Sequence, residues 1–144
     1  MNVSIKKVTS QEDLKKCLAL RIEVFVHGQK VPMDEEIDGK DETSEHYLLF
    51  IDHHPVGVAR VRFVDDFAKI ERVAILDDYQ GKGLGKQLME AILSELEKHA
   101  TVTVAKLGAQ TYAIPFYEKL GFIVCSEEYM DAGISHKDMK INFR

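Results

Sequence analysis

A glycine-rich turn limits what this chain can fold into more than any other part of its sequence. The turn reads Gln80-Gly81-Lys82-Gly83-Leu84-Gly85 and follows a stretch, residues 68–76, with the composition of a β-strand. After the turn, apolar residues recur at every fourth position, the spacing of one helical face, at Leu84, Leu88, Ile92 and Leu96. This part of the chain therefore predicts a strand, a tight turn and a helix.

Such a turn is suited to binding an anion. Glycines remove side-chain bulk, and the following helix presents unpaired backbone N–H groups and the positive end of its dipole. Lys82 and Lys86 add positive charge. The Walker spacing and the GxGxxG spacing are both absent, which disfavours nucleotide hydrolysis. A plain flexible connection is the alternative interpretation.

The rest of the pattern predicts a mixed α/β order with an antiparallel front half. Residues 2–8 alternate as a strand does, and Ser10 with Asp13 has the spacing of a capping box for a helix that ends near Gly28. A long loop then reaches Glu45. Further strands are expected at 46–52, 56–63, 68–76, 101–107, 122–125 and 137–143, with a hairpin turn at 52–55 and a second late helix at 109–120.

Length and composition are those of a soluble globular domain. The 144 residues fit one domain, 1–144, and the formal net charge of −5 gives no basic field for nucleic acid. The longest apolar run, 47–51, is too short to span a membrane, and the first residues do not form a signal peptide. Cys17 and Cys125 are too few for a disulfide framework or a zinc site. We therefore expect two reduced core thiols in a cytoplasmic protein.

A second segment that could take part in catalysis is 113–122, Ala-Ile-Pro-Phe-Tyr-Glu-Lys-Leu-Gly-Phe. Tyr117 falls inside a short predicted helix that ends at Gly121. A phenol has an ordinary pKa near ~10 and can protonate a leaving thiolate of similar basicity, so Tyr117 is a candidate general acid. A core tyrosine with a satisfied hydroxyl is the alternative.

Together these two features resemble the GNAT N-acetyltransferase superfamily. Gln80-x-x-Gly83-x-Gly85 after Val73-Ala74-Ile75 is similar to its acyl-CoA signature, and residues 116–122 resemble its closing segment. Several short motifs resemble the small ElaA-like or YjcF-like branch, namely Phe25-Val26 with Gln29, Glu36-x-Asp38, 107–110 with Tyr112-Ala113, and Gly133-Ile134-x-His136-x-x-Met139. The resemblance implies the α/β (α+β) GNAT acyl-CoA N-acyltransferase fold, a mixed, mostly antiparallel sheet of six to seven strands flanked by about four helices.

The same resemblance implies an acyltransferase that moves an acetyl group from acetyl-CoA to a primary amine by direct attack, without a metal. Backbone groups of Val73 and Ile75 would pair with the pantetheine arm, the turn amides would receive the pyrophosphate, and an amide near Ile75 would stabilise the oxyanion. Tyr117 would protonate the departing thiolate. The implied cofactor-binding residues are Val73, Ala74, Ile75, Gln80, Gly81, Lys82, Gly83, Leu84, Gly85, Lys86, Gln110 and Phe116.

The attacking amine must also lose a proton. Glu71, on the strand that leads to the cofactor, is the first candidate base, and His136 is the second. An ion pair between Glu71 and a neighbouring arginine, and a plain hydrogen-bonding role for His136, are the alternatives.

An acidic segment, 34–45, holds seven acids and one lysine in twelve residues. Its spacing partly fits an EF-hand, but Pro32 before it and the strand-like residues after it disfavour calcium. It would draw a cationic polyamine or a lysine-like amine toward the acceptor side, with Glu36 touching the substrate. A solvated charged loop is the alternative.

Two functions of different class follow. The first is an N-acetyltransferase acting on a small-molecule or peptide amine, with no nucleic-acid or membrane partner. The second is a non-catalytic module that binds CoA as a sensor or interaction domain. Pairing of two copies through the C-terminal strands is a further expectation.

Overall fold

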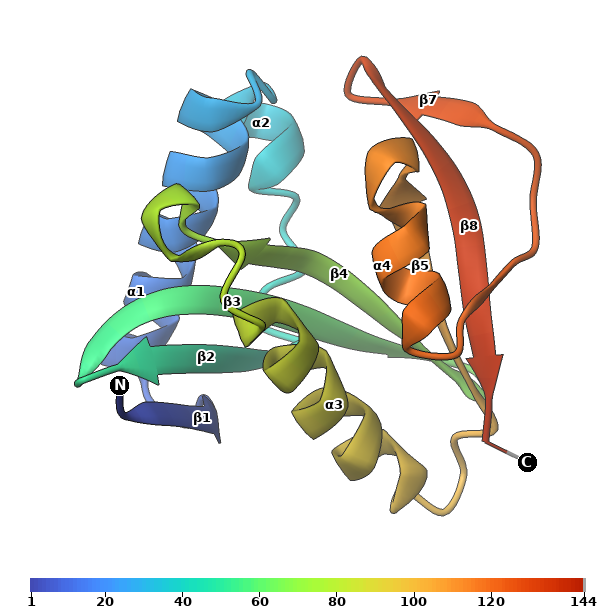
Figure 1. Ribbon diagram of the computed structural model, residues 1–144, viewed down its shortest axis with the longest axis horizontal. Coiled ribbons are helices and arrows are strands. Elements are labelled where there is room, and N and C mark those ends of the chain that lie inside the picture. The colour runs from blue at the N-terminus through green and yellow to red at the C-terminus, as the bar shows by residue number, and fades with distance from the viewer. Residues whose placement is uncertain (144) are drawn as a thin grey trace.

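The computed structural model describes residues 1–143 and folds them into a mixed sheet with helices on both faces (Figure 1). The strands are β1 (Val3–Lys7), β2 (Glu45–Ile51), β3 (His54–Val64), β4 (Phe67–Ile75), β5 (Val104–Gln110), β6 (Ile123–Val124), β7 (Tyr129–Asp131) and β8 (Ile134–Asn142). The helices are α1 (Gln11–Arg21), its π-helical continuation η1 (Ile22–Gly28), α2 (Met33–Glu36), α3 (Leu84–Glu97) and α4 (Ile114–Lys119). Short 3-10 turns, η2 (Asp77–Tyr79) and η3 (Thr111–Ala113), precede α3 and α4.

The eight strands lie in the order β1-β2-β3-β4-β5-β8-β6, and β7 also pairs with β8. The predicted antiparallel front half is confirmed, because β1 to β4 pair antiparallel in succession. The predicted hairpin turn between β2 and β3 is confirmed as well. Asp52 and His53 there have φ values of 48° and 72°, the left-handed values that the favoured two-residue hairpin turn requires.

Two apolar cores lie on the two faces of the sheet. The predicted α3 stripe, Leu84, Leu88, Ile92 and Leu96, is at most 2% exposed and packs with residues such as Leu49 and Val61. On the opposite face, α1 places Cys17 and Leu20 against Leu48 and Phe50. Adjacent β2 residues, such as Leu48 and Leu49, thus point to opposite faces of the sheet and pack in different cores, as the two-residue period of a strand requires. The Ser10 side chain caps α1 by accepting a hydrogen bond from the Asp13 amide at 3.1 Å.

The parallel pair β4–β5 is short and then opens. Only Phe67 to Lys69 pair with Val104 to Lys106. Beyond them, β4 continues to pair with β3, and β5 continues to pair with β8. In Figure 1, β4 runs to the left, while β8, the antiparallel partner of β5, stands on the right with its arrow pointing down. The backbone ladder therefore leaves an open space between the far ends of β4 and β5.

Some predictions about the fold need correction. Cys125 is exposed and not a core thiol, because β6 beside it is only two residues long and lies at the sheet edge, whereas Cys17 is fully buried. The helix predicted for 109–120 begins at Ile114, since β5 keeps pairing with β8 as far as Gln110. The predicted loop 28–45 contains α2, and β8 begins at Ile134 in an unpredicted hairpin with β7.

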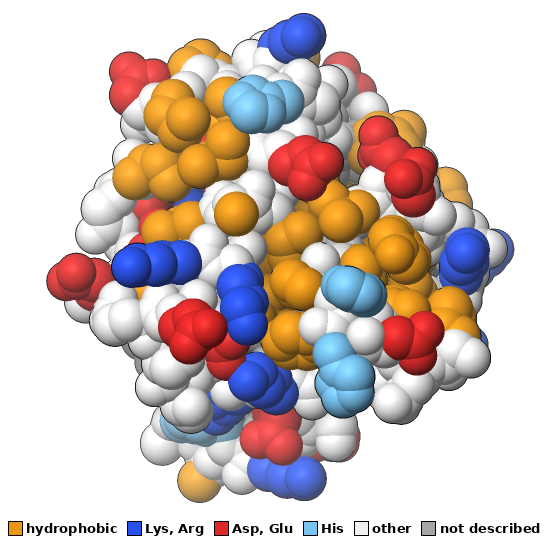
Figure 2. Space-filling view, turned by 90° about the vertical axis from the view of Figure 1, so that its left-hand side faces the viewer, with side chains coloured by type: hydrophobic (Ala, Val, Ile, Leu, Met, Phe, Trp, Pro, Cys, Tyr) orange, Lys and Arg blue, Asp and Glu red, His pale blue; other side chains and the backbone are white. Residues whose placement is uncertain are grey.

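Charges of both signs are mixed on the left-hand side of the molecule, which Figure 2 shows face on. Hydrophobic side chains gather there in patches that charged side chains interrupt. Within residues 1–143, no helix is long and apolar enough to cross a membrane.

Candidate active site

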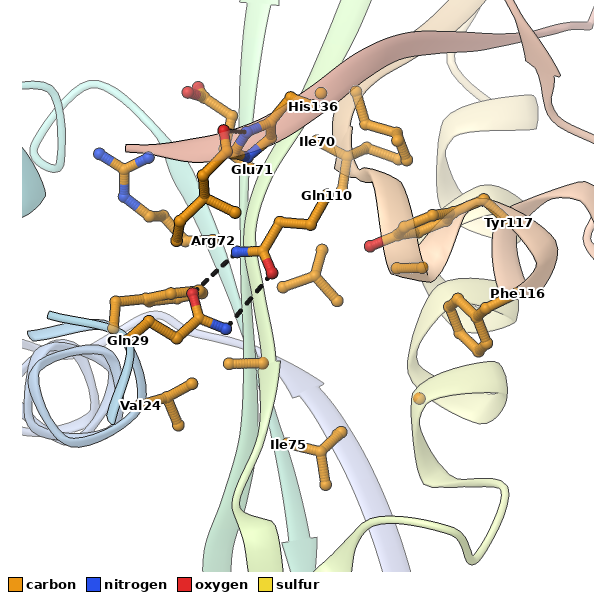
Figure 3. Close-up of a pocket in the computed structure, with 18 of the residues that line it drawn as sticks. Val24, Gln29, Ile70, Glu71, Arg72, Ile75, Gln110, Phe116, Tyr117 and His136 are labelled. Atoms are coloured by element: carbon orange, nitrogen blue, oxygen red, sulfur yellow. Dashed lines mark hydrogen bonds between the residues drawn. The ribbon is translucent and has the colours of Figure 1, made fainter. Parts of the chain in front are cut away.

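A cleft of about 710 Å³ lies where β4 and β5 diverge. Its walls come from β4, the glycine-rich turn, the first turn of α3, the end of β5, α4, η1 and the β7–β8 hairpin (Figure 3). Of the residues predicted for the site, the structure brings together Glu36, Glu71, Val73, Ala74, Ile75, Gln80, Gly81, Gly83, Leu84, Gly85, Lys86, Gln110, Phe116, Tyr117 and His136. Lys82 does not line the cleft, and its ammonium lies 5.7 Å from the centre of the Tyr79 ring.

The glycine-rich turn has the geometry of an anion cradle. Gly81 and Gly83 have φ values of 77° and 76°, which glycine adopts without strain. No atom lies within 4 Å of where a Cβ would stand on either residue. Gly83 caps α3 without a side-chain hydrogen bond, so the first amides of the helix are unpaired and available to a ligand.

The side chain of Gln80 ties this turn to the end of β4. Its side-chain amide donates to the Ile75 carbonyl at 3.0 Å and to Asp77 Oδ1 at 3.3 Å. The side chain therefore joins the end of β4 to the turn, and Gln80 also lines the cleft.

A β-bulge interrupts β4 inside the cleft. Val58 faces Ala74 and Arg60 faces Glu71, so Ala59 alone stands opposite both Arg72 and Val73. Arg72 has a φ of 57°, in the left-handed region. A bulge leaves backbone groups outside the ladder and bends the strand, which makes the backbone near Val73 accessible to a bound molecule.

Tyr117 lies on the α4 wall with its hydroxyl directed into the cleft, toward Gln110 (Figure 3). Its ring packs edge-on against Phe116 and Phe122, with centroids 5.0 and 5.9 Å apart. Burial raises the pKa of the Tyr117 phenol above its ordinary value. The hydroxyl has no hydrogen-bond partner among residues 1–143 and keeps its proton at neutral pH, so it is free to donate to a bound group. Gly85 gives α4 room to approach, since a Cβ there would stand 3.3 Å from the Phe116 ring.

Gln110 pairs with a residue that was not predicted as part of the site. Its amide nitrogen donates to Gln29 Oε1 at 2.8 Å, and Gln29 donates back at 3.4 Å, so the pair bridges β5 and the end of η1 (Figure 3). The two residues are 81 positions apart. No local signal marks Gln29 as a site residue, although it belongs to one of the branch motifs in the sequence.

His136 stands beside Gln110, since the two are register partners on β8 and β5. Its Nδ1 lies 2.7 Å from the Ile134 carbonyl. A carbonyl only accepts, so Nδ1 carries the hydrogen and Nε2 keeps a free lone pair. The imidazole is 9% exposed and stacks on the Tyr129 ring with centroids 5.8 Å apart.

Comparison with known proteins identifies the architecture. Residues 6–143 match the family described as an acetyltransferase (GNAT) domain. The chain belongs to the GNAT acetyltransferase family. The N-acetyltransferase YjcF of Bacillus subtilis is 42% identical over 134 residues, which cover 90% of this chain and 93% of YjcF. The crystal structure of Escherichia coli ElaA superposes with a TM-score of 0.87 at 31% identity, covering 96% of this chain and 99% of ElaA. A GNAT acetyltransferase of Elizabethkingia anophelis, solved with acetyl-CoA bound, shares the fold at 19% identity with a TM-score of 0.73, over 98% of both chains.

This membership confirms three predictions. The chain has the GNAT acyl-CoA N-acyltransferase fold, it is an acyltransferase, and its relatives are those of the ElaA-like and YjcF-like branch. The sheet has eight strands where six to seven were expected, because the β7–β8 hairpin adds one.

Glu71 of this GNAT chain is held in ion pairs. It accepts hydrogen bonds from Arg62 Nε and, at 3.2 Å, from Arg60. Burial acts to raise the pKa of the Glu71 carboxyl, but the hydrogen bond from Arg62 and the charges of Arg60 and Arg62 outweigh it and lower the pKa below its ordinary value. The arginine ion pair that the sequence left open as an alternative is therefore present, and Glu71 is a weak proton acceptor.

The acidic segment of the GNAT chain has two parts: Glu36, Asp38 and Asp41 pair with arginines, whereas Asp34, Glu35 and Glu42 are exposed to solvent. Glu36 is 2% exposed and lies 2.8 Å from Arg21 Nε and 2.9 Å from Arg72 Nε. Asp38 and Asp41 bind the fully buried Arg60 at 2.8 and 3.0 Å. We call the residues Arg21, Glu36, Asp38, Asp41, Arg60, Arg62, Glu71 and Arg72 the arginine–acid cluster. Four positive and four negative side chains balance in it, so the charges of Glu36, Asp38 and Asp41 are neutralised by arginines.

Histidine, cysteine, aspartate and glutamate side chains do not gather in groups of three that could hold a metal ion anywhere in residues 1–143. Of the acids at the EF-hand positions of the 34–45 segment, Glu36 and Asp38 face arginines and Glu45 faces Lys7.

Proposed function

We propose that this chain transfers the acetyl group of acetyl-CoA to a primary amine, with donor and acceptor bound together in the cleft. One observation carries the proposal. The glycine-rich cradle and Tyr117 line the same cleft, so CoA with its pyrophosphate on the cradle would extend its thioester arm into the cleft that Tyr117 lines.

The cofactor side is assigned to backbone groups. The amides at the start of α3 bind the pyrophosphate, with Lys86 at the cleft wall adding charge. The backbone of Val73 and Ile75 pairs with the pantetheine arm where the bulge interrupts the ladder. A backbone N–H of this same stretch stabilises the oxyanion that forms on the thioester oxygen.

The chemical step needs one proton donor and one acceptor. The amine nitrogen attacks the thioester carbonyl carbon, the C–S bond breaks, and Tyr117 gives its phenolic proton to the departing thiolate. His136 Nε2 accepts the proton that the amine loses, and this proton returns through water to the Tyr117 phenolate. The free lone pair of His136 supports this assignment, and the paired carboxylate of Glu71 makes Glu71 the second choice.

The cradle is tested by ligand-induced stabilisation. At a hundred times its dissociation constant, acetyl-CoA should add roughly 2.7 kcal/mol to the free energy of unfolding. Gly83→Glu should fold and lose this shift because the new carboxylate occupies the cradle. Gly39→Glu is the matched control, since Gly39 has a φ of 80° and equally open surroundings outside the cleft. An equal shift in both variants would show that acetyl-CoA does not bind at the cradle.

The catalytic groups are tested by amine acetylation with free-thiol detection. Tyr117→Phe should bind acetyl-CoA normally and lose about 10²-fold in turnover. His136→Phe keeps the stack on Tyr129 and should lose turnover to a similar degree, while Glu71→Gln should mainly lower stability. An unchanged rate in Tyr117→Phe would remove its role as the acid, and a larger loss of turnover in Glu71→Gln than in His136→Phe would make Glu71 the base.

A further inference from the structure

Four side chains form a row across the acceptor side of the cleft, from β7 through β8 and β5 to the residue after η1. Tyr129 and Gln110 are both register partners of His136, from opposite neighbouring strands. Side chains in such register positions lie on one face of a sheet, close together. Gln29 completes the row through its paired hydrogen bonds with Gln110. We call Gln29, Gln110, His136 and Tyr129 the acceptor row.

The acceptor row offers lone pairs without offering negative charge. Each amide oxygen of Gln29 and Gln110 accepts one hydrogen bond from the other residue and keeps a second lone pair. His136 Nε2 keeps a third. A primary ammonium group has three N–H donors. His136 matches the proton that leaves the ammonium before attack. The two amide oxygens match the two N–H groups of the neutral amine, one of which loses its proton when the amide forms.

The walls beside the row are largely apolar. Val24, Phe25 and Val31 line the cleft from the η1 side and are partly buried. Ile134 lines it from the β7–β8 hairpin, where Tyr129 also presents its ring. The glycine at position 108 leaves room for the Tyr129 hydroxyl, because a Cβ there would stand only 2.7 Å from Tyr129 Oη. The hydroxyl donates a hydrogen bond to Asp138 Oδ1 at 2.5 Å.

The charges around the acceptor side do not favour a second cation. Glu36 and Glu71 line the cleft, but arginines neutralise both. Lys69 also lines it, and within the described residues this ammonium forms no ion pair, so it would repel another positive charge. Glu35 and Asp131 are exposed at the rim, where water screens their charges.

We infer that the acceptor is a primary amine carried on an uncharged, apolar or aromatic arm. The amine nitrogen binds the Gln29, Gln110 and His136 part of the acceptor row, and the arm lies between the η1 wall and the β7–β8 hairpin. This inference rests on the proposed function and names its substrate class. A polyamine or a lysine side chain with its free α-amino group would place a second ammonium against apolar side chains or near Lys69. Its carboxylate partners in the cleft lining would be Glu35 and Asp131, whose exposed charges water screens.

The substrate class is tested with the wild-type protein and acetyl-CoA at a saturating concentration. Free-thiol release is followed with 2-phenylethylamine and hexylamine as neutral-arm amines, and with spermidine and lysine as cationic ones. We expect kcat/KM to be at least tenfold higher for the neutral-arm amines. Equal or higher kcat/KM for spermidine or lysine would overturn the inference and leave the proposed function intact.

The acceptor row is tested with Gln29→Leu, which removes one amide oxygen at similar side-chain size. It should lower kcat/KM for 2-phenylethylamine at least tenfold, with the KM for acetyl-CoA unchanged. Gln11→Leu is the matched control, because Gln11 is exposed at the start of α1, away from the cleft, and should leave both constants unchanged. An unchanged amine kcat/KM in Gln29→Leu would refute the role of the row.

Failure of the proposed function gives a different result. If no amine releases thiol while acetyl-CoA still stabilises the wild-type protein and not Gly83→Glu, the cleft binds the cofactor without amine acetylation. That outcome would refute the proposed function and this inference together.

Discussion

The arginine–acid cluster predicts a large loss of stability when Glu36 is replaced by glutamine. Glu36 is 2% exposed and shares its carboxylate between Arg21 and Arg72. Removing one partner of a buried ion pair typically costs about 3–5 kcal/mol. Arg21 keeps Asp41 at 2.6 Å and Arg72 keeps Asp38 at 3.4 Å, so we expect the lower end, about 3 kcal/mol. A domain of this length has an unfolding entropy near ~0.3 kcal/mol/K at its midpoint, which converts 3 kcal/mol into about 10 °C of Tm.

Asp34→Asn is the matched control for Glu36→Gln. Asp34 lies in the same short helix α2, is exposed, and has no ion pair with any other residue of 1–143. Both variants remove one negative charge, so a general effect of net charge is the same in each. Asp34→Asn should change stability by at most about 0.5 kcal/mol. Thermal and urea unfolding followed by circular dichroism at pH 7 make the comparison, and melting points within 2 °C of each other would refute the buried cluster.

Two further predictions concern titration and thiol reactivity. The hydrogen bond from Arg60 holds the pKa of the Asp38 carboxyl well below its usual range. The Asp38–Arg60 pair therefore stabilises the fold above about pH 4, and this stabilisation is lost as the pH falls toward the lowered pKa. Urea unfolding between pH 6 and pH 3 should show this loss and Asp38→Asn should reduce it, whereas identical pH dependence in the two proteins would count against the Arg60 pair. Burial raises the pKa of the Cys17 thiol to about 12 while Cys125 is exposed, so a thiol reagent should titrate one cysteine in the folded protein and two in denaturant; rapid reaction of both in the folded protein would contradict the buried position of Cys17.

The glycine-rich turn and α3 could be predicted from the sequence because their determinants are local. The four-residue spacing of α3 and the glycines of the turn lie within one short stretch, and their conformations follow from backbone geometry. Tyr117 was found for a similar reason, since its helix and the glycine that ends it are adjacent in sequence. The family resemblance also rested on these two stretches.

The acceptor side could not be predicted in the same way. Gln29 meets Gln110 only because η1 and the end of β5 approach in space, and no periodicity links positions 81 residues apart. The position of β5 was predicted three residues too early, at 101–107 instead of Val104–Gln110, for a related reason. Pairing with β8 extends it to Gln110 and places Gln110 beside His136, and that pairing depends on strands far apart in the chain.

The acidic segment shows how a charge pattern can be misinterpreted without its partners. In the sequence, the acids of residues 34–45 form a dense run, and the arginines that meet them are single residues on α1, β3 and β4. Folding brings Arg21, Arg60 and Arg72 to this run and cancels the charge of its inner acids.

The same arginines also determine the chemistry of the neighbouring site. Arg60 and Arg62 hold Glu71 as a paired carboxylate with a lowered pKa, and for this reason we propose His136 and not Glu71 as the base. With Glu36 and Glu71 paired to arginines, the acceptor row and the apolar walls beside it are the surfaces that we propose for the acceptor. On that proposal, anchoring of the acidic segment and preference for a neutral-arm amine would be two consequences of one buried cluster.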